Sequence, residues 1–224
     1  MDLPQVVIIE LGGQYTLLIQ RMVRELGVRS MILTPVQAEI HFESHTVQAV
    51  ILSGGSSSVY DSDAPRLPSN LLKLTREDGR QVPIFGICYG MQWVVRVLGG
   101  KVTPASGKQE YGRAHVRICN DSSHMFDGTA ERQQVWMSHT DSVIELPDGF
   151  ETLAISDNGV ISAIAYEHVW GVQFHPEVSH TSHGKKILQN FLTRARCAWD
   201  WAPEFLIDGI RARAEEVCHG KRAI

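Results

Sequence analysis

Residues 83–92, PIFGICYGMQ, decide the fold, because a short apolar run passes here directly into a helical pattern. An uninterrupted apolar run of this length is typical of a strand buried on both faces of a parallel sheet. From Tyr89 to about Leu98 the spacing predicts a helix, and the two glycines at 99–100 predict its end. A buried strand followed at once by a helix is the unit of an α/β sheet.

The same unit recurs along the first half of the chain. Strands are predicted at 6–9, 30–33 and 49–52, with helices at 16–26 and near 71–74. Beyond Gly100 the alternation of strands and helices stops. Strands are predicted at 116–118, 135–137, 152–155, 161–166 and 171–174, followed by a helix at 184–196. The alternation predicts an α/β fold with a doubly wound, mostly parallel sheet flanked by helices.

One boundary is visible near the C-terminal end of the sequence. Residues 199–203, WDWAP, interrupt the last helix of the main unit, and an amphipathic segment follows at 205–217. We therefore expect a main domain at 1–198 and a helical appendage at 199–224.

The composition excludes several classes of protein. Hydrophobic residues make up 43% of the 224 and the net charge is −4, without a cluster of Lys and Arg, which argues against a nucleic-acid-binding face. No apolar run approaches the roughly 20 residues of a membrane span, and the first residues lack the basic start of a signal peptide. The four cysteines show no C-x-x-C spacing, so reduced cytoplasmic thiols are expected rather than disulfides or a metal site.

Cys88 is the first candidate for chemistry. It lies in Gly86-Ile87-Cys88-Tyr89-Gly90, where the predicted strand turns sharply into the helix. Such a turn presents a nucleophile, and the positive end of the helix favours thiolate over thiol. The alternative is an inert buried cysteine, since free cysteines often lie in cores. Cys119, Cys197 and Cys218 have no such context and are expected to be non-catalytic.

His175 and Glu177 are the second candidates, at the end of a later apolar strand. A nucleophilic cysteine needs a base, and the base needs a carboxylate that orients it. Residues two apart in extended backbone point the same way, so this pair can face one site. The alternative is an exposed His-Pro-Glu turn, because exposed His and Glu are common.

The Ser53-Gly54-Gly55 turn after the strand at 49–52 is the third candidate. Free N–H groups in a glycine-rich turn at this edge of a sheet can bind an oxyanion. A phosphate loop of ATP pyrophosphatases begins in a similar way, but it requires Asp where this chain has Ser57. An oxyanion site is therefore favoured over a phosphate site.

These three motifs, in this order, resemble the class I glutamine amidotransferases, whose fold is flavodoxin-like. Residues 12–15, 135–141 and 171–181 are further similar to the amidotransferase part of the GMP synthase family. The resemblance covers nearly the whole chain, and the tail after Trp199 is similar to the connection to a synthetase domain. Two positions depart from that family, with Ser56 where Pro is usual and Gly13 where Ser is usual.

The resemblance implies a role for each matching residue. Cys88 would be the nucleophile, His175 the general base and acid, and Glu177 the orienting carboxylate. The oxyanion hole would use backbone N–H groups of Gly55 and Tyr89. The α-groups of glutamine would be held by three residues: Gln92, one helical turn after Cys88, Ser138 and His139. The alternatives are an ordinary helix-surface residue for Gln92 and a satisfied structural histidine for His139.

The implied reaction is glutamine hydrolysis to glutamate and ammonia, which needs no metal and no organic cofactor. ATP and Mg²⁺ are implied for an ATP-pyrophosphatase synthetase domain that aminates XMP to GMP, either in the same longer chain or as a separate subunit. The Ser-Gly-Gly-x-Asp-Ser loop of that domain does not occur here. The resemblance also suggests a cytoplasmic enzyme, a homodimer when complete, with no nucleic-acid or membrane partner.

Three other functions stay open from the sequence. Amidotransferases for anthranilate, carbamoyl phosphate or CTP synthesis carry the same three motifs, although residues 136–141 and 178–181 argue against them. A peptidase of the same fold would not require Gln92 and Ser138. A catalytically silent regulatory module would not require Cys88, His175 and Glu177 together.

Overall fold

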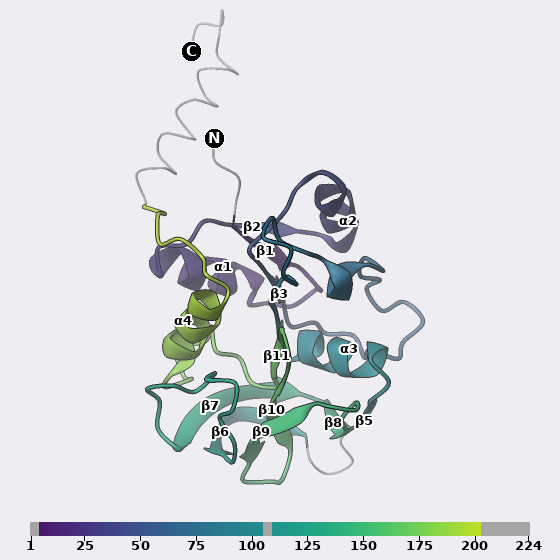
Figure 1. The fold of residues 1–224 in the computed structure, drawn as a ribbon. Coiled ribbons are helices and arrows are strands. Elements are labelled where there is room, and N and C mark those ends of the chain that lie inside the picture. The colour runs from purple at the N-terminus through teal and green to yellow at the C-terminus, as the bar shows by residue number, and fades with distance from the viewer. Residues whose placement is uncertain (1–4, 105–108, 203–224) are drawn as a thin grey trace, which may run out of the picture.

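A nine-stranded sheet runs through the computed structural model, which describes residues 5–104 and 109–202 (Figure 1). Its strand order is β2-β1-β3-β4-β11-β10-β9-β6-β7. The strands span, in chain order, β1 Val6–Ile9, β2 Ser30–Leu33, β3 Ala49–Leu52, β4 Ile84–Ile87, β6 Glu110–Ile118, β7 Arg132–His139, β9 Glu151–Ser156, β10 Ile161–Tyr166 and β11 Val169–Val172. A separate pair joins β5 (Lys101–Pro104) to β8 (Asp141–Glu145).

The sheet has a parallel half and an antiparallel half. Strands β2, β1, β3, β4 and β11 are parallel to their neighbours in this order. From β11 onward, β10, β9, β6 and β7 pair in antiparallel fashion and form the lower part of the molecule in Figure 1. The predicted doubly wound α/β fold is therefore confirmed, with the parallel strands concentrated in the half that carries Cys88.

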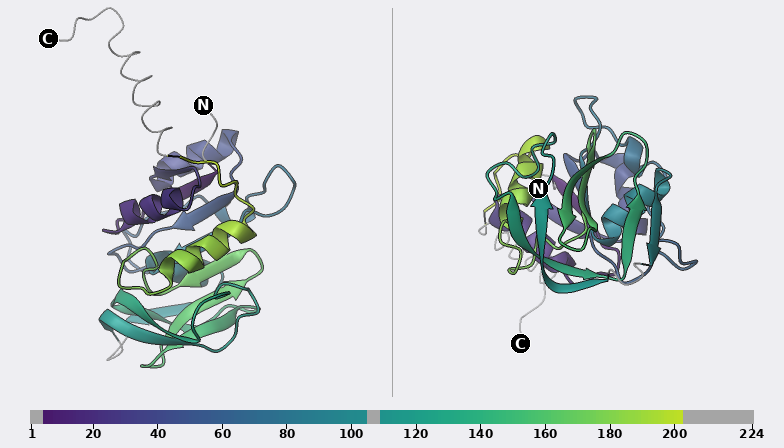
Figure 2. Two further views of the ribbon diagram at one scale, coloured as in Figure 1. Left: turned by 90° about the vertical axis from the view of Figure 1, so that its left-hand side faces the viewer. Right: turned by 90° about the horizontal axis from the view of Figure 1, so that it is seen from below.

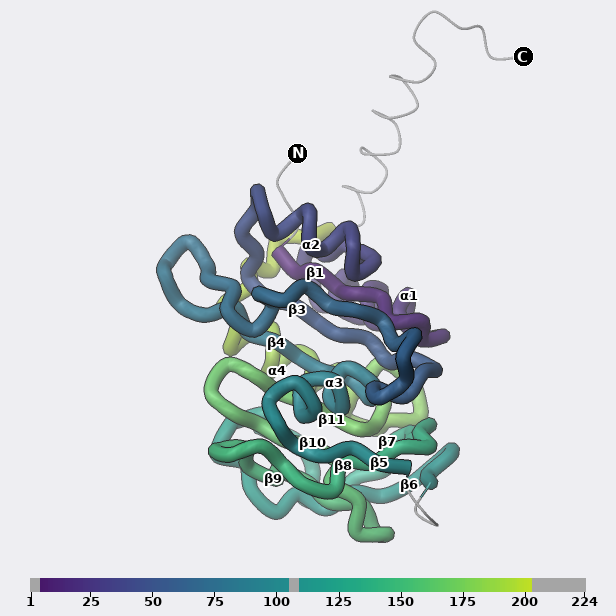
Figure 3. The backbone as a smooth tube through the Cα atoms, turned by 90° about the vertical axis from the view of Figure 1, so that its right-hand side faces the viewer, coloured from purple at the N-terminus to yellow at the C-terminus, as the bar shows by residue number. Residues whose placement is uncertain are grey.

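Helices cover both faces of the parallel half. α1 (Thr16–Glu25) and α4 (Gly184–Arg194) lie on one face, as Figure 2 shows, and α2 (Pro35–Ser44) and α3 (Tyr89–Val97) lie on the other, as Figure 3 shows. Successive strand residues point to opposite faces. Accordingly, Val6 and Ile8 pack with Ile19 of α1, whereas Val7 and Ile9 belong to the core of the other face.

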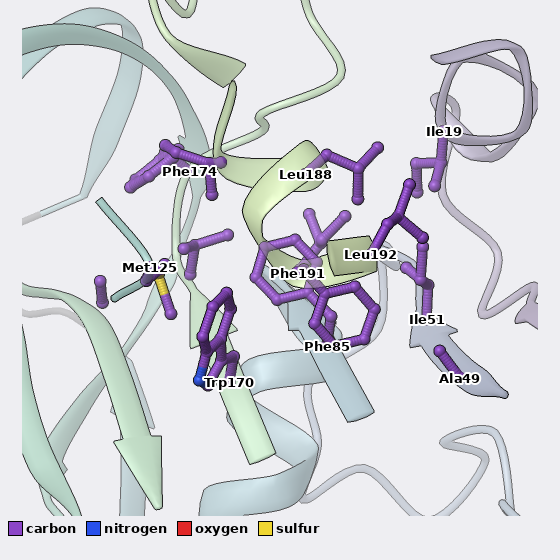
Figure 4. Close-up of a cluster of buried hydrophobic side chains, with 14 of the residues drawn as sticks. Ile19, Ala49, Ile51, Phe85, Met125, Trp170, Phe174, Leu188, Phe191 and Leu192 are labelled. Carbon is purple, nitrogen blue, oxygen red and sulfur yellow. The ribbon is translucent and has the colours of Figure 1, made fainter. Parts of the chain in front are cut away.

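Aromatic side chains fill the core under α4 (Figure 4). The Phe191 ring stacks on Phe85 of β4 at a centroid distance of 5.1 Å and lies 5.9 Å from the ring of Trp170 on β11. All three side chains are almost fully buried. This cluster holds β4 and β11 beside each other, and both strands end at the same edge of the sheet because they are parallel.

Four details differ from the sequence prediction. The helix expected near 71–74 is only a 3₁₀ turn at Leu71–Lys73, within a long loop whose leucines pack on the core of one sheet face. The strand expected at 171–174 is paired at Val169–Val172, so residues 173 and 174 lie beyond it. Helix α2 and the β5–β8 pair were not predicted. Thr34 and Gln37 form a capping box at the start of α2, and Pro35 occupies its first turn.

The predicted division at 198/199 is a different case, since the amphipathic segment 205–217 lies outside the described residues. The boundary therefore stays a prediction. Residues 199–202 are described and contact the main domain, where the Trp201 N–H donates to the Gly27 carbonyl at 2.8 Å. Within the described residues, none of the helices has both the length and the apolar character that crossing a membrane requires.

We expect Phe191→Ala to lower the free energy of unfolding by about 3–5 kcal/mol, because it removes the ring that packs β4 against β11 and leaves a cavity. Leu17→Ala is the matched control: this α1 side chain is 73% exposed, so a change within about 0.5 kcal/mol is expected. Urea denaturation followed by fluorescence measures both. Equal losses for the two variants would contradict the assigned role of this cluster.

Candidate active site

Cys88 occupies a strained turn between β4 and α3. Its backbone has φ 51° and ψ −106°, in a region that residues with a side chain rarely adopt. A Cβ on Gly86 would lie 2.6 Å from the Gly90 carbonyl carbon, and one on Gly90 would lie 2.6 Å from the Leu52 carbonyl oxygen. The two flanking glycines are therefore needed because the turn folds tightly on itself and against β3.

The Cys88 sulfur lies at the base of a pocket, where three groups surround it. Gln173 Nε2 approaches Sγ at 3.5 Å, and the Ser138 carbonyl oxygen lies 3.7 Å away. The third is His175, whose imidazole lies beside Cys88 in the same pocket lining. Tyr89 begins α3 directly after Cys88, so the positive end of this helix also faces the sulfur.

His175 and Glu177 form a buried pair beside Cys88. His175 Nδ1 lies 2.7 Å from Glu177 Oε1, and the side chains are only 7% and 1% exposed. The backbone holds the histidine in place, since its N–H donates to the Trp136 carbonyl at 2.9 Å and its carbonyl accepts from Thr181 Oγ1 at 2.7 Å. The structure therefore brings together the cysteine, histidine and glutamate singled out in the sequence.

The electrostatic environment keeps His175 protonated. Burial by itself would lower the pKa of His175, but hydrogen bonds to Cys88 and Glu177 and the negative charge of Glu177 outweigh it and raise the pKa from 6.5 to about 10. The other carboxylate oxygen of Glu177 is buried without a hydrogen-bond partner among the described residues. Its charge is therefore neutralised mainly by the imidazolium.

The Ser53-Gly54-Gly55 turn packs directly on these residues. A Cβ on Gly54 would lie 3.0 Å from His175 Cε1, and one on Gly55 would lie 3.1 Å from Tyr89 Cγ. Ser53 Oγ accepts from the Leu11 N–H at 2.9 Å and donates to the Gly54 carbonyl at 2.8 Å, which fixes the turn.

Two backbone donors are left free at this turn. Within residues 5–104 and 109–202, the N–H groups of Gly55 and Tyr89 have no protein acceptor. Because Gly55 packs against Tyr89, both donors lie beside the pocket that holds Cys88. Such a pair can receive the negative oxygen of a tetrahedral intermediate.

The pocket itself has a volume of about 340 Å³ and a largely polar lining. It is walled by the turn at 12–15, the turn at 54–58, the start of α3, residues 138–141 and His175. Gly13 and Ser56, the two residues that depart from the pattern of the similar family, both line this pocket. A Cβ on Gly13 would overlap the Gly54 carbonyl oxygen, so the absence of a side chain there lets the two turns touch.

The three residues predicted to hold the α-groups of glutamine all line the pocket. Gln92 Nε2 already donates to the Asp141 carbonyl at 2.9 Å and to Gln173 Oε1 at 3.0 Å, which leaves its own oxygen as the remaining polar atom. His139 uses both ring nitrogens, toward the Asp141 carbonyl at 2.9 Å and Glu110 Oε2 at 3.2 Å. The roles of Gln92, Ser138 and His139 toward a substrate stay predictions.

Sequence reasoning missed two polar residues of this site, Glu110 and Gln173. Burial would raise the pKa of Glu110, but hydrogen bonds from His139, Ser156 and Asn158 lower it, so Glu110 is a carboxylate behind the pocket wall. Nothing near residue 110 in the sequence signals that partner. Gln173 could have been found, because it stands two residues before His175 on the same alternation that relates His175 to Glu177.

The other described cysteines lie outside the pocket lining. Cys119 is exposed, and its thiol lies 3.7 Å from the Thr152 carbonyl. Cys197 is buried, and that burial raises the pKa of its thiol to about 12. Cys218 falls outside the described residues.

Replacing Glu177 by Gln is expected to weaken the fold in a pH-dependent manner. The folded pKa of His175, about 10, lies above the unfolded value of 6.5, so the pair stabilises the fold fully below about pH 6.5 and progressively less as the pH rises toward 10. The native protein should therefore have a higher unfolding free energy than Glu177→Gln, and this difference should be larger at about pH 6 than at about pH 9.5. Urea titrations at both pH values measure this difference.

The control for that experiment is Glu39→Gln, which changes an exposed carboxylate on α2. It should alter stability little and almost equally at the two pH values. A stability difference for Glu177→Gln that grew with pH would contradict the proposed ion pair.

Comparisons with known proteins identify the family of the chain. Residues 7–195 match the family model described as glutamine amidotransferase class-I. The chain is 45% identical over 217 residues to the GMP synthase [glutamine-hydrolyzing] of Pyrobaculum aerophilum, covering 94% of this chain and 41% of that protein. It is 42% identical over 220 residues to that of Aquifex aeolicus, covering 95% and 40%. The chain thus spans about two fifths of the curated relatives it matches.

A solved structure gives the same result for the fold. The crystal structure of a putative GMP synthase subunit from Thermoplasma acidophilum superposes with a TM-score of 0.74 at 28% identity, covering 88% of this chain and 96% of that one. A glutamine amidotransferase from Thermotoga maritima, 21% identical and with a TM-score of 0.60, shares the fold over 98% of this chain and 95% of its own. With the family model matching residues 7–195, this chain belongs to the class I glutamine amidotransferases.

Proposed function

We propose that this pocket hydrolyses glutamine through Cys88, His175 and Glu177, and that the ammonia serves the amination of XMP to GMP. The observation that carries the glutaminase proposal is that Cys88, Gly55 and His175 line one pocket, with His175 held by the buried Glu177. A nucleophile, an oriented proton carrier and an oxyanion site are the three requirements of acyl transfer.

The reaction begins from a Cys88 thiolate and a protonated His175. The sulfur attacks the side-chain amide carbon of glutamine, and the Gly55 and Tyr89 N–H groups receive the resulting oxyanion, each worth on the order of 3 kcal/mol. The carbon–nitrogen bond breaks as His175 gives its proton to the leaving nitrogen, which departs as ammonia. A glutamyl thioester remains on Cys88, and His175 is neutral.

Water then completes the cycle. His175 takes a proton from the water, the oxygen attacks the thioester carbon, and the carbon–sulfur bond breaks to release glutamate. The sulfur returns as a thiolate beside a protonated His175. The high pKa of His175 supports the acid step, because the group is charged at neutral pH when the leaving nitrogen needs its proton.

The α-groups of glutamine would contact Gln92 and residues 138–139. Both amide protons of Gln92 are used within the protein, so only its oxygen remains for a ligand. An amide oxygen accepts hydrogen bonds, which suits an α-ammonium group. For His139 both ring nitrogens are occupied, so its contribution would come from its backbone.

The GMP part of the proposal rests on the relatives and on two stretches that meet behind the site. Gln134 Nε2 donates to the His180 carbonyl at 2.9 Å, the Trp136 N–H donates to Thr181 Oγ1 at 3.0 Å, and the Trp136 and His180 rings lie 4.9 Å apart. Trp136, His180 and Thr181 belong to residues 135–141 and 171–181, which carry the resemblance to the GMP synthase family, so these two stretches are in direct contact beside His175.

ATP and Mg²⁺ would be bound by a synthetase unit rather than by this chain. The Ser53-Gly54-Gly55 turn packs on Cys88 and His175, which supports an oxyanion site there rather than a phosphate loop. That unit would either continue the same chain or be a separate subunit. The homodimer and the cytoplasmic location stay predictions.

We expect His175→Ala to lower glutamine hydrolysis at least about a hundredfold and Glu177→Gln to lower it less, because Glu177 orients the base without transferring the proton. Cys88→Ser should abolish measurable hydrolysis. Ammonia release from glutamine measures all three, with the exposed Cys119→Ser as control. Full activity of Cys88→Ser would overturn the proposed nucleophile.

The coupling to GMP formation has its own test. The purified chain with XMP, ATP and Mg²⁺ should make no GMP from either glutamine or ammonia. With the remaining part of a GMP synthase relative added, the native chain should allow both nitrogen sources and Cys88→Ser only ammonia. GMP formation by the chain alone would refute the proposed division of labour.

A further inference from the structure

A chain of side-chain amides ends at the catalytic sulfur. Gln173 is fully buried and lies outside the pocket lining, directly beyond β11. Its Nε2 lies 3.5 Å from Cys88 Sγ, and its Oε1 accepts from Gln92 Nε2 at 3.0 Å. Gln173 therefore contacts the reacting atom from behind, away from the side on which a substrate would bind.

The orientation of both amides follows from one backbone carbonyl. The Asp141 carbonyl can only accept, so the Gln92 atom 2.9 Å from it must be the amide nitrogen. That nitrogen also faces Gln173, which must present its oxygen to Gln92 and consequently its NH₂ group to the sulfur. Flipping either amide would place two donors or two acceptors against each other.

The contacts of the sulfur favour its negative form. A thiolate accepts hydrogen bonds, and Gln173 offers one at 3.5 Å; the protonated His175 beside Cys88 also favours a negative sulfur. The Ser138 carbonyl, 3.7 Å away, acts in the opposite direction, because it suits a thiol that donates. Gln173 and the protonated His175 thus favour the thiolate, and the Ser138 carbonyl favours the thiol. Without Gln173, only His175 would favour the thiolate. His175 must give up its proton during the reaction, whereas an amide does not.

We propose that Gln173 is a further catalytic residue: its side-chain amide, aimed by Gln92 and the Asp141 carbonyl, donates a hydrogen bond that stabilises the Cys88 thiolate. The assignment rests on the proposed glutaminase function. It also accounts for the thioester step, since the same donor stabilises the sulfur when it leaves as a thiolate.

Two substitutions separate this role from a structural one. Gln173→Glu keeps an oxygen for Gln92 but places a carboxylate oxygen against the sulfur. Gln173→Met removes the donor and also leaves the Gln92 proton without an acceptor. If Gln173 acts on the sulfur, the Glu variant is impaired at least as much as the Met variant. If it only supports Gln92, the Glu variant resembles the native protein and the Met variant is the worse one.

The measurement is the rate of Cys88 alkylation by iodoacetamide across pH, with peptide mapping to distinguish it from Cys119. We expect both variants to slow alkylation at about pH 8 by about tenfold or more, as for loss of a hydrogen bond to a charged group, and to move the pH of half-maximal rate upward. For glutamine hydrolysis, kcat should fall in Gln173→Glu while KM stays close to native. Gln133→Met is the matched control, because Gln133 is also buried, on β7, and among the described residues its side chain bonds only to Thr129 and Ala130.

The outcomes distinguish this inference from the function on which it rests. Native alkylation rates in Gln173→Glu, or slowing in Gln133→Met equal to that in the Gln173 variants, would overturn the role of Gln173 and leave the glutaminase proposal standing. Native protein that alkylates at Cys88 but hydrolyses no glutamine would overturn the glutaminase proposal. The alkylation rates of the Gln173 variants would still decide whether the amide acts on the sulfur.

Discussion

The parallel pairing of β4 with β11 is the constraint on which the site depends. Ile87 pairs with Val172 in this register, and the Cys88 N–H donates to the Val172 carbonyl at 2.7 Å. Cys88 therefore follows one strand and His175 follows its neighbour, both at the same edge of the sheet. A shift of register by one residue would exchange the faces of the strand and separate the sulfur from the imidazole. The aromatic cluster around Phe191 stabilises this pairing from the sheet face that α4 covers.

Close backbone packing is the second requirement, and it explains the glycines of the motifs. Gly86 and Gly90 allow the Cys88 turn to fold against β3, and Gly54 and Gly55 allow the Ser53-Gly54-Gly55 turn to touch His175 and Tyr89. Gly13 extends the same principle to the first turn of the fold, where a side chain would meet the Gly54 carbonyl. The departure from Ser at position 13 therefore fits a site in which two turns are in direct contact. For Ser56, the structure offers no comparable explanation.

Burial then strengthens the interactions within this arrangement. Cys88, His175, Glu177 and Gln173 are all nearly excluded from solvent, so their mutual hydrogen bonds operate at a low local dielectric. The carboxylate of Glu177 has His175 as its principal partner, and the imidazolium faces the sulfur in turn. An alignment of charges of this kind requires a rigid frame, which the backbone hydrogen bonds of His175 to Trp136 and Thr181 supply.

The sequence by itself determined the α/β class, most strands of the parallel half, and the three motifs, because each depends on local patterns: an apolar run, a strand-to-helix turn, an alternation of two. It missed helix α2, although Thr34 and Gln37 carry a capping signature, and it overestimated the helix near Leu71. Only the tertiary structure decided what His139 and Gln92 can still offer a ligand, since Glu110 is distant in the chain from His139, and Asp141 and Gln173 are distant from Gln92. Whether a buried polar atom is free or occupied depends on contacts between such distant segments, and no local pattern encodes them.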